Sequence, residues 1–191
     1  MVNRYRKNLH EMLTSILNDE GDELFISEIE QRCKSLSGRF SFINERNIRE
    51  IGAVLAYQLF IEIEIPRTLY EITNIFSITT KHFNEAYKKV FGSYLRPLSP
   101  EQFVPLYLTR LGYPEIEPQV TRVCKEVGGD MIGEGYKPST IAIAAIIYCA
   151  RNNGRKLKEG DVTRTSHVYV NQFNLKKCVN ALTVLVEKQA S

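Results

Sequence analysis

The chain has 191 residues, of which 43% are apolar and 25% are charged, with 7 prolines and 11 glycines. This is the composition of an ordinary folded protein, and the length suits either one large domain or two small ones. A net charge of +3 is too small to indicate an anionic partner by itself.

Missing sequence patterns exclude several further classes of protein. The first residues are polar and the periodic segment after them is interrupted by charge, so we expect neither a signal peptide nor a membrane association. No phosphate-binding glycine loop, HExxH motif or nucleophile signature occurs, so we expect no enzyme, no cofactor and no small-molecule substrate. The four cysteines have no short metal-ligand spacing, which predicts reduced thiols in an intracellular protein and no metal site: Cys33, Cys124, Cys149 and Cys178.

Apolar residues at helical spacing predict five helices in the first half of the chain. The first spans Tyr5 to Leu17, the second carries Leu24 to Cys33, and the third opens at Asn44. Thr68 is expected to cap a short fourth helix, because Glu71 three residues later completes a capping box. A fifth helix follows a tight turn and ends at Gly92, with apolar positions Phe83, Ala86, Tyr87 and Val90.

The second half begins with Ser99-Pro100-Glu101-Gln102, a strong start signal with a cap, a proline at the first helical position and a glutamine at the box position. We expect one helix from there to Gly112. The next helix carries Val120 to Val127, and Gly128-Gly129 should weaken its second half at a cost of order 1 kcal/mol per glycine. The last helix carries Phe173, Leu175, Val179, Leu182 and Leu185.

One stretch, Pro138 to Arg155, is apolar on every face and sharply bounded at both ends. Ile141 to Ala150 are all Ile, Ala, Tyr or Cys, yet the run is too short to cross a bilayer. Pro138 suits a first helical position, and Asn152-Asn153-Gly154 supplies residues that tolerate the left-handed backbone of a helix stop. These features predict a central helix that other helices surround.

The two halves share a pattern that indicates an internal repeat. Ala53 and Ala144, and likewise Tyr57 and Tyr148, correspond at an offset of 91 residues (from 53 to 144). Phe83 and Leu175 correspond at 92 (from 83 to 175), so a one-residue insertion reconciles the two sets. We therefore predict an all-α fold of two tandem five-helix repeats, residues 1–93 and 99–191, joined by a linker at 94–98. The two tyrosines are expected at equivalent sites.

Two motifs, one from Pro66 to Ile72 and one from Pro138 to Tyr148, resemble the transcription initiation factor IIB (TFIIB) group, whose core has two cyclin-like repeats of five helices after a zinc ribbon. Pro66-Arg67-Thr68-Leu69-Tyr70-Glu71-Ile72 is similar to the PRT-x-x-EI of the family's first repeat. PSTIAIAAIIY, which starts at Pro138, is similar to the SP-x-x-(I/V)-A-x-A-A-(I/L)-Y of its second. The resemblance covers roughly Ile48 to Val186.

This resemblance implies a general transcription initiation factor core. Its implied partners are the TATA-binding protein, promoter DNA and RNA polymerase, its implied location is the nucleus, and we expect a monomer. Because no CxxC occurs, the zinc ribbon is missing, so the chain looks like a C-terminal core fragment or a divergent member. Glu50, Glu62 and Glu64 depart from the family pattern in the third helix, so its DNA or partner contacts are expected to differ. The fourth helix of the second repeat, near Thr163-Arg164, is hard to place.

The candidate functional residues follow from charge and from the motif. Residues 151–188 hold eight basic against three acidic side chains, a local net charge of +5. In the family, helices four and five of each repeat form a helix-turn-helix-like pair. Matching the end of the second repeat to the motif places Phe173, Asn174 and Lys176 where TFIIB-like proteins read base pairs beside the TATA element. Candidate phosphate contacts are Arg151, Arg155, Lys156, Lys158 and Lys177, and first-repeat candidates for DNA or partner contact are Lys81, His82, Lys88 and Lys89.

Each candidate has an alternative interpretation. Phe173 could pack in the core beside Leu175, Asn174 could be only a cap or turn residue, and Lys176 could be solvated surface. His82 has no second His or Cys at ligand spacing, so a surface position is expected rather than a metal site.

At the level of function, the competing class is a cyclin-type module that binds and activates a kinase, which shares the fold. The acidic first repeat favours that class, and the basic end of the second repeat opposes it.

Overall fold

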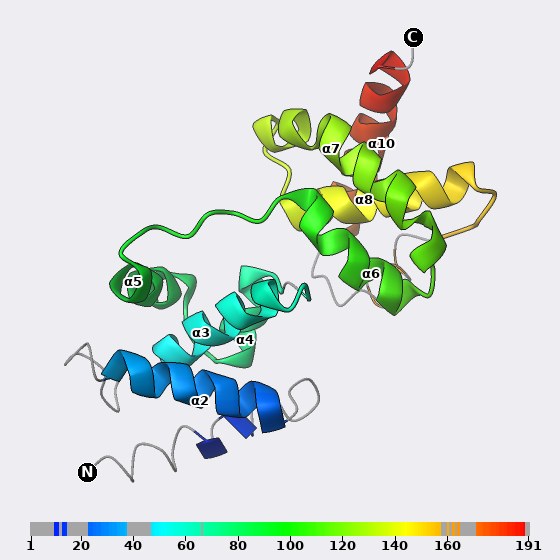
Figure 1. The fold of residues 1–191 in the computed structure, drawn as a ribbon. Coiled ribbons are helices and arrows are strands. Elements are labelled where there is room, and N and C mark those ends of the chain that lie inside the picture. Colours follow the sequence, from blue (N-terminus) through cyan, green and yellow to red (C-terminus); the bar gives the residue numbers. More distant parts are fainter. Residues whose placement is uncertain are drawn as a thin grey trace. The chain divides into compact units, whose positions relative to one another are not determined.

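The computed structural model describes residues 10–11, 13–14, 23–37, 47–65, 67–157, 160, 162, 164 and 171–189. These residues form helices joined by turns and loops, and no strand occurs among them (Figure 1). The predicted all-α class is therefore confirmed. The chain divides into two compact units, Met1–Arg96 and Pro97–Ser191.

In the first unit, α3 (Ile48–Glu62) is the helix that the others contact. The helices α2 (Glu23–Ser37), α4 (Leu69–Ile75) and α5 (Thr80–Phe91) all pack against it. Its middle is apolar and small, with Ala53, Val54 and Ala56 fully buried. The predicted start at Asn44 lies outside the described residues, and the described helix begins at Ile48 after Asn47.

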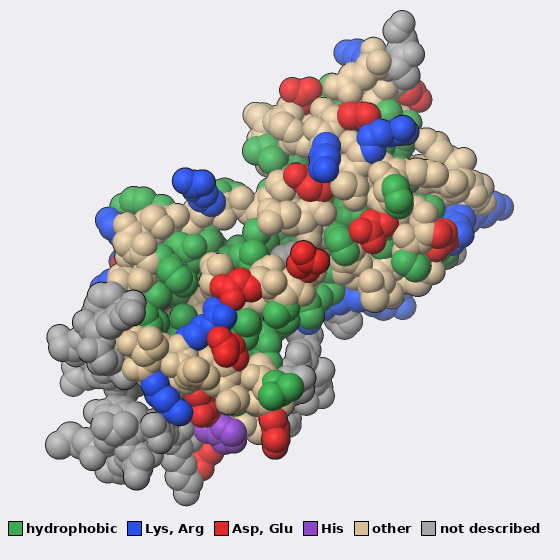
Figure 2. All heavy atoms as spheres, in the orientation of Figure 1, with side chains coloured by type: hydrophobic (Ala, Val, Ile, Leu, Met, Phe, Trp, Pro, Cys, Tyr) green, Lys and Arg blue, Asp and Glu red, His purple; other side chains and the backbone are tan. Residues whose placement is uncertain are grey.

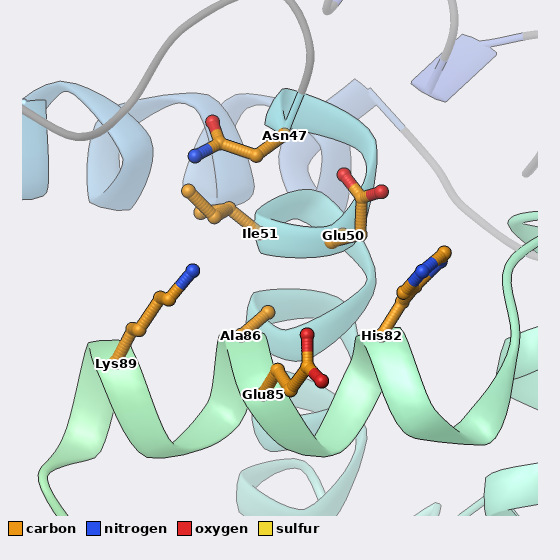
Figure 3. A pocket seen from close by; sticks show the side chains of 7 residues that line it. All are labelled: Asn47, Glu50, Ile51, His82, Glu85, Ala86 and Lys89. Carbon is orange, nitrogen blue, oxygen red and sulfur yellow. The ribbon is translucent and has the colours of Figure 1, made fainter.

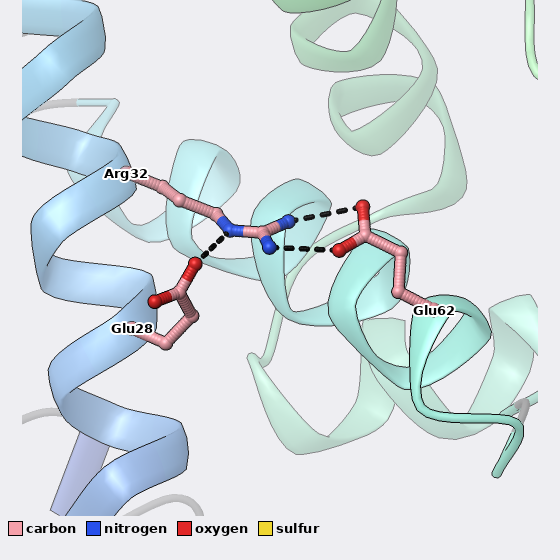
Figure 4. Close-up of polar contacts among 3 residues, drawn as sticks. All are labelled: Glu28, Arg32 and Glu62. Carbon is pink, nitrogen blue, oxygen red and sulfur yellow. Dashed lines mark hydrogen bonds and ion pairs between the residues drawn. The ribbon is translucent and has the colours of Figure 1, made fainter.

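An ion pair fixes α2 against the end of α3. Arg32 donates from Nη1 and Nη2 to the two carboxylate oxygens of Glu62, at 3.0 and 2.7 Å, and from Nε to Glu28 at 2.7 Å (Figure 4). Such two-pronged geometry is the strong form of an arginine–carboxylate contact. The hydrogen bonds between Arg32 and Glu62 favour the charged form of both groups. They lower the pKa of Glu62 and raise the pKa of Arg32. Glu62 is thus a structural residue, which explains one departure from the family pattern.

The start of α4 is fixed by the predicted capping box. The Glu71 backbone N–H donates to Thr68 Oγ1 at 3.1 Å, and the Glu71 carboxylate accepts from the Thr68 backbone N–H at 2.7 Å. The preceding residue, Arg67, is buried with its guanidinium carbon 5.3 Å from the centre of the Phe60 ring and its Nη1 3.7 Å from Glu71 Oε1. At the other end, α5 stops at Gly92, whose φ of 70° suits glycine.

The second unit contains η1 (Pro100–Phe103), α6 (Val104–Leu111), η2 (Pro114–Ile116), α7 (Glu117–Gly133), α8 (Pro138–Asn152) and α10 (Gln172–Gln189). The expectation of one continuous helix from Ser99 to Gly112 was wrong. Pro105 has no N–H to donate to the Glu101 carbonyl, which disfavours a continuous α-helix here but suits the first turn of a new one. That carbonyl accepts from the Val104 N–H instead, which closes a 3-10 turn before α6 begins.

The glycine pair on α7 does not interrupt the helix, which continues to Gly133. Gly128 is buried against the ring of Pro100, and a Cβ at this position would lie 3.3 Å from Pro100 Cγ. A glycine destabilises a helix, but here it allows close packing, because a larger residue would push η1 away from α7.

The predicted central helix is α8. Every residue from Ile141 to Ile147 has no exposed surface, and η1, α6, α7 and α10 all pack around the helix. Pro138 occupies its first turn, and the backbone turns at Gly154, where φ is 73°. Both predicted boundaries are confirmed.

The internal repeat is visible in the described helices. Both α3 and α8 have 15 residues, and Ala53 and its counterpart Ala144 are fully buried, as are Phe83 and Leu175. The tyrosines differ, because Tyr57 is 2% exposed whereas Tyr148 is half-buried and lines a groove between α8 and α10. Most of the first predicted helix and most of residues 158–170 lie outside the described residues, so the count of five helices per repeat stays a prediction.

All four cysteines are buried and none forms a disulfide. Burial raises the pKa of Cys33, Cys124 and Cys178 to about 12 and that of Cys149 to about 11. The thiols are therefore protonated at neutral pH and act as small apolar core residues.

The Ala145→Glu substitution tests the central position of α8. A carboxylate there would be surrounded on all sides by apolar atoms, with neither space nor a partner, so we expect a loss of about 3 kcal/mol or more of unfolding free energy. The control is Asn180→Glu on the exposed side of α10, which should change stability by no more than about 0.5 kcal/mol. Urea unfolding followed by circular dichroism would measure both, and equal stability of the two variants would contradict the arrangement.

The Glu62→Gln substitution tests the α2–α3 ion pair. The Glu62 side chain is 41% exposed, so solvent screening limits the expected loss at pH 7 to about 1 kcal/mol. Because the pKa of Glu62 is lowered in the folded state, its charge stabilises the fold above the pKa of the unfolded chain, and this contribution disappears as pH falls through the folded pKa. The melting temperatures of wild type and variant should therefore converge in acid. If the difference in melting temperature between wild type and variant stayed constant from pH 7 to pH 3, the contribution of Glu62 to stability would not be ionic.

Candidate nucleic-acid interface

The first turn of α10 presents a set of exposed side chains. Asn171 precedes the helix, and its Oδ1 accepts from the Phe173 backbone N–H at 2.9 Å. One face of α10 is buried through Leu175, Cys178, Val179 and Leu182. Its opposite face carries four of the predicted site residues, all exposed: Phe173, Asn174, Lys176 and Lys177.

Phe173 is 64% exposed, so the alternative of a core position beside Leu175 is wrong. The Lys177 ammonium lies 4.4 Å from the centre of the Phe173 ring, one helical turn away. The capping role considered for Asn174 belongs to Asn171, and Asn174 is an exposed residue of the first turn. The combination of an aromatic ring, an amide and two ammonium groups can stack on or hydrogen-bond to nucleic-acid bases, and it can neutralise phosphates.

The cations that follow α8 differ from one another. Arg151 and Lys156 are exposed. Arg155 forms an ion pair with Glu115, and its guanidinium carbon lies 4.5 Å from the centre of the Tyr113 ring, so its charge is already matched within the unit. Lys158 lies outside the described residues. Lys156 is therefore better placed than Arg155 to contact a phosphate, because Arg155 already pairs with Glu115.

In the first unit, the four candidate residues all lie exposed on α5: Lys81, His82, Lys88 and Lys89. Lys88 donates to the Tyr94 hydroxyl at 3.0 Å and lies 4.6 Å from the centre of its ring. This hydrogen bond lowers the pKa of Tyr94. His82 and Lys89 line a pocket with two glutamates, so this surface is of mixed charge.

No sequence pattern indicated Tyr94, Tyr113, Glu115 or Asn171 as site residues. The acidic partner of Arg155 is distant in sequence, so no local pattern could reveal it. On the face shown in Figure 2, Lys and Arg side chains are interspersed with Asp and Glu rather than gathered into one continuous patch. In the part of the chain that the structure describes, no group of three or more His, Cys, Asp or Glu side chains could hold a metal ion, and no helix is apolar and long enough to span a membrane.

The described residues therefore define an all-helical chain whose second unit ends in a helix with an exposed basic and aromatic first turn. Comparison with known proteins confirms its resemblance to transcription initiation factor IIB. The chain is 24% identical over 132 residues to the factor from Methanoculleus marisnigri, which is 67% of this chain and 39% of the relative. It is 27% identical over 177 residues to transcription initiation factor IIB 2 from Thermoplasma volcanium, which is 87% of this chain and 55% of the relative.

A third relative, the factor IIB from Methanococcus aeolicus, is 25% identical over 130 residues, which is 66% of this chain and 39% of the relative. The chain thus spans between about two fifths and just over half of the length of these curated relatives. No family model matches the chain.

The Glu115→Gln substitution tests whether the ion pair restrains Arg155. Once its carboxylate partner is neutral, Arg155 can turn to a polyanion, so we expect tighter binding to duplex DNA and a salt slope steeper by up to about one unit. Glu134→Gln removes the same charge from an exposed site elsewhere on the unit and serves as the control. Fluorescence anisotropy at several salt concentrations would measure both. Equal gains in the two variants would mean that net charge, and not release of Arg155, is responsible.

Proposed function

We propose that the chain is a transcription initiation factor core that binds the complex of the TATA-binding protein with promoter DNA and bridges it to RNA polymerase. In this role the protein is an adaptor and not an enzyme, and it acts as a monomer without a cofactor. Sequence similarity to three archaeal factors named transcription initiation factor IIB supports the general role. The nuclear location expected from the resemblance stays a prediction.

The observation that carries the proposal is the exposed first turn of α10. The Phe173 ring is 64% exposed and lies beside the exposed amide of Asn174 and the ammonium groups of Lys176 and Lys177, and this combination, rather than the exposed ring alone, supports a contact surface. Asn174 and Lys176 beside it carry the groups that read adenine and guanine in a major groove. In this proposal Phe173, Asn174 and Lys176 face base edges, and Lys156 and Lys177 face phosphates, with Arg151 as a further phosphate contact.

A cyclin-type module that activates a kinase remains the competing function, since it would use the same helical architecture. The pairing of Arg155 with Glu115 is the observation in its favour, because it removes one cation from the proposed DNA surface. Salt dependence separates the two, because contacts to phosphates release counterions and give a steep salt slope. Binding to promoter DNA with TATA-binding protein that is insensitive to salt, or absent, would favour the protein-binding module.

Two alanine substitutions test the division of labour on the DNA surface. Lys156→Ala should weaken binding to the complex of TATA-binding protein and DNA about equally on all flanking sequences, and should lower the salt slope by roughly one unit. Lys176→Ala should cost about 1 to 3 kcal/mol on the preferred flank and much less on a scrambled flank, because a base contact is lost. Gel-shift titrations on both DNAs would measure these effects.

The control for both is Lys125→Ala, which removes an exposed lysine from α7 and should leave binding nearly unchanged. Equal losses of Lys176→Ala on the two flanks would make this residue a backbone contact. If neither variant lost affinity, the DNA-binding face would lie elsewhere, and the result would favour the cyclin-type module that binds a kinase.

A further inference from the structure

A small pocket lies in the first unit between the first turn of α3 and the middle of α5. Its volume is about 100 Å³. Figure 3 shows the side chains that line it: Asn47, Glu50, Ile51, His82, Glu85, Ala86 and Lys89. The four contributed by α5 follow the helical spacing i, i+3, i+4 and i+7, so they share one face of that helix.

The charges around this pocket are not balanced. Glu50 is half-buried, and its Oε2 atom is shielded from water and accepts no hydrogen bond. Neither Glu50 nor Glu85 forms an ion pair with another described residue. In Figure 3, Ala86 lies between Glu85 and Lys89, and the Lys89 side chain is directed toward Ile51. Two carboxylates and one ammonium therefore line the pocket, together with the imidazole of His82.

An orphaned carboxylate oxygen withdrawn from water is costly, because it has lost its hydration without gaining a donor. The negative charge of a carboxylate is shared between its two oxygens, so a cation that reaches either oxygen of Glu50 relieves this cost. The described groups do not form a metal site. A molecular cation that carries hydrogen-bond donors would satisfy the carboxylates of Glu50 and Glu85.

The size of the pocket limits that cation. At about 30 Å³ per water, the volume equals roughly three waters, well below the 300 Å³ or more of typical small-molecule sites. It suits the head group of one side chain. A guanidinium has several donors in a fixed plane and is weakly hydrated, so it satisfies two carboxylates better than an ammonium does. Ile51 and Ala86 supply apolar contacts for the methylene groups behind it.

We propose that this pocket receives an arginine side chain from a protein partner, held by Glu50 and Glu85. This inference goes beyond the DNA-binding function and does not depend on it. Two carboxylates repel phosphate, so the pocket is a protein contact and not a DNA contact. Of the first-unit candidates, His82 and Lys89 line this pocket and are thus placed beside a protein contact rather than a DNA contact.

The test uses the full chain labelled with ¹⁵N and N-acetyl-arginine amide as the probe. In heteronuclear NMR titrations we expect saturable shifts of the backbone amides at 47–51 and 82–89. N-acetyl-citrulline amide, which has the same shape without the charge, should produce no such shifts. Equal shifts with both probes, or shifts spread over the whole chain, would overturn the proposal.

Three variants sharpen the test. Glu50→Gln should weaken arginine amide binding by roughly tenfold or more while leaving the melting temperature unchanged or higher, because an unpaired charge is removed. Lys89→Ala should tighten binding, because it removes the competing cation. Glu23→Gln, at an exposed site on α2, serves as the control and should neither weaken nor tighten the binding of arginine amide. Unchanged affinity of Glu50→Gln, or weaker binding by Lys89→Ala, would refute the site. Since no DNA is present, these outcomes are independent of the Lys156 and Lys176 results.

Discussion

The structure of the second unit depends on one constraint, which is that α8 has no polar face. Ile141 to Ile147 have no exposed surface, so every side of the helix must be covered by another element. That requirement explains why η1, α6, α7 and α10 all contact α8. It also explains Gly128, because the ring of Pro100 must approach α7 closely for η1 to reach α8. A single apolar sequence thus fixes the positions of most other helices in its unit.

The same constraint positions the candidate nucleic-acid surface. Leu175, Cys178 and Leu182 are buried on one side of α10, and this fixes the rotation of the helix about its axis. Once that rotation is fixed, Phe173 and Lys176 must point to solvent, since they lie on the opposite side at helical spacing. The exposed side chains are therefore held by a rigid helix rather than by a loop, as a surface that distinguishes one base pair from another requires.

Much of this arrangement could be predicted from sequence because its signals are local. The capping box at Thr68 and Glu71 depends on residues a few positions apart, as do the boundaries of α8. The candidate site was harder to predict, because exposure and pairing depend on tertiary structure. The spacing of Phe173 allowed either a core or a surface position, and only the rotation of α10 decided between them. Glu62 looked like a departure that would alter partner contacts, yet it binds Arg32 from a helix 30 residues earlier. Contacts between residues so far apart in sequence leave no periodic pattern in a single chain.

These pairings change how the charge of the chain should be interpreted. Counting residues gives a local excess of +5 between 151 and 188, but the partner of Arg155 is Glu115, which lies outside that segment. In the first unit, Arg32 and Arg67 likewise meet carboxylates. A charge that is matched within its own unit must lose that partner before it can bind another, so it contributes less to recognition than an unmatched one. The informative charges are therefore those with no ion-pair partner among the described residues, such as Lys156 and Lys176 in the second unit and the half-buried carboxylate of Glu50 in the first. The two lysines favour an anionic partner at the end of the second unit, and the carboxylate of Glu50 favours a cationic group at its own pocket.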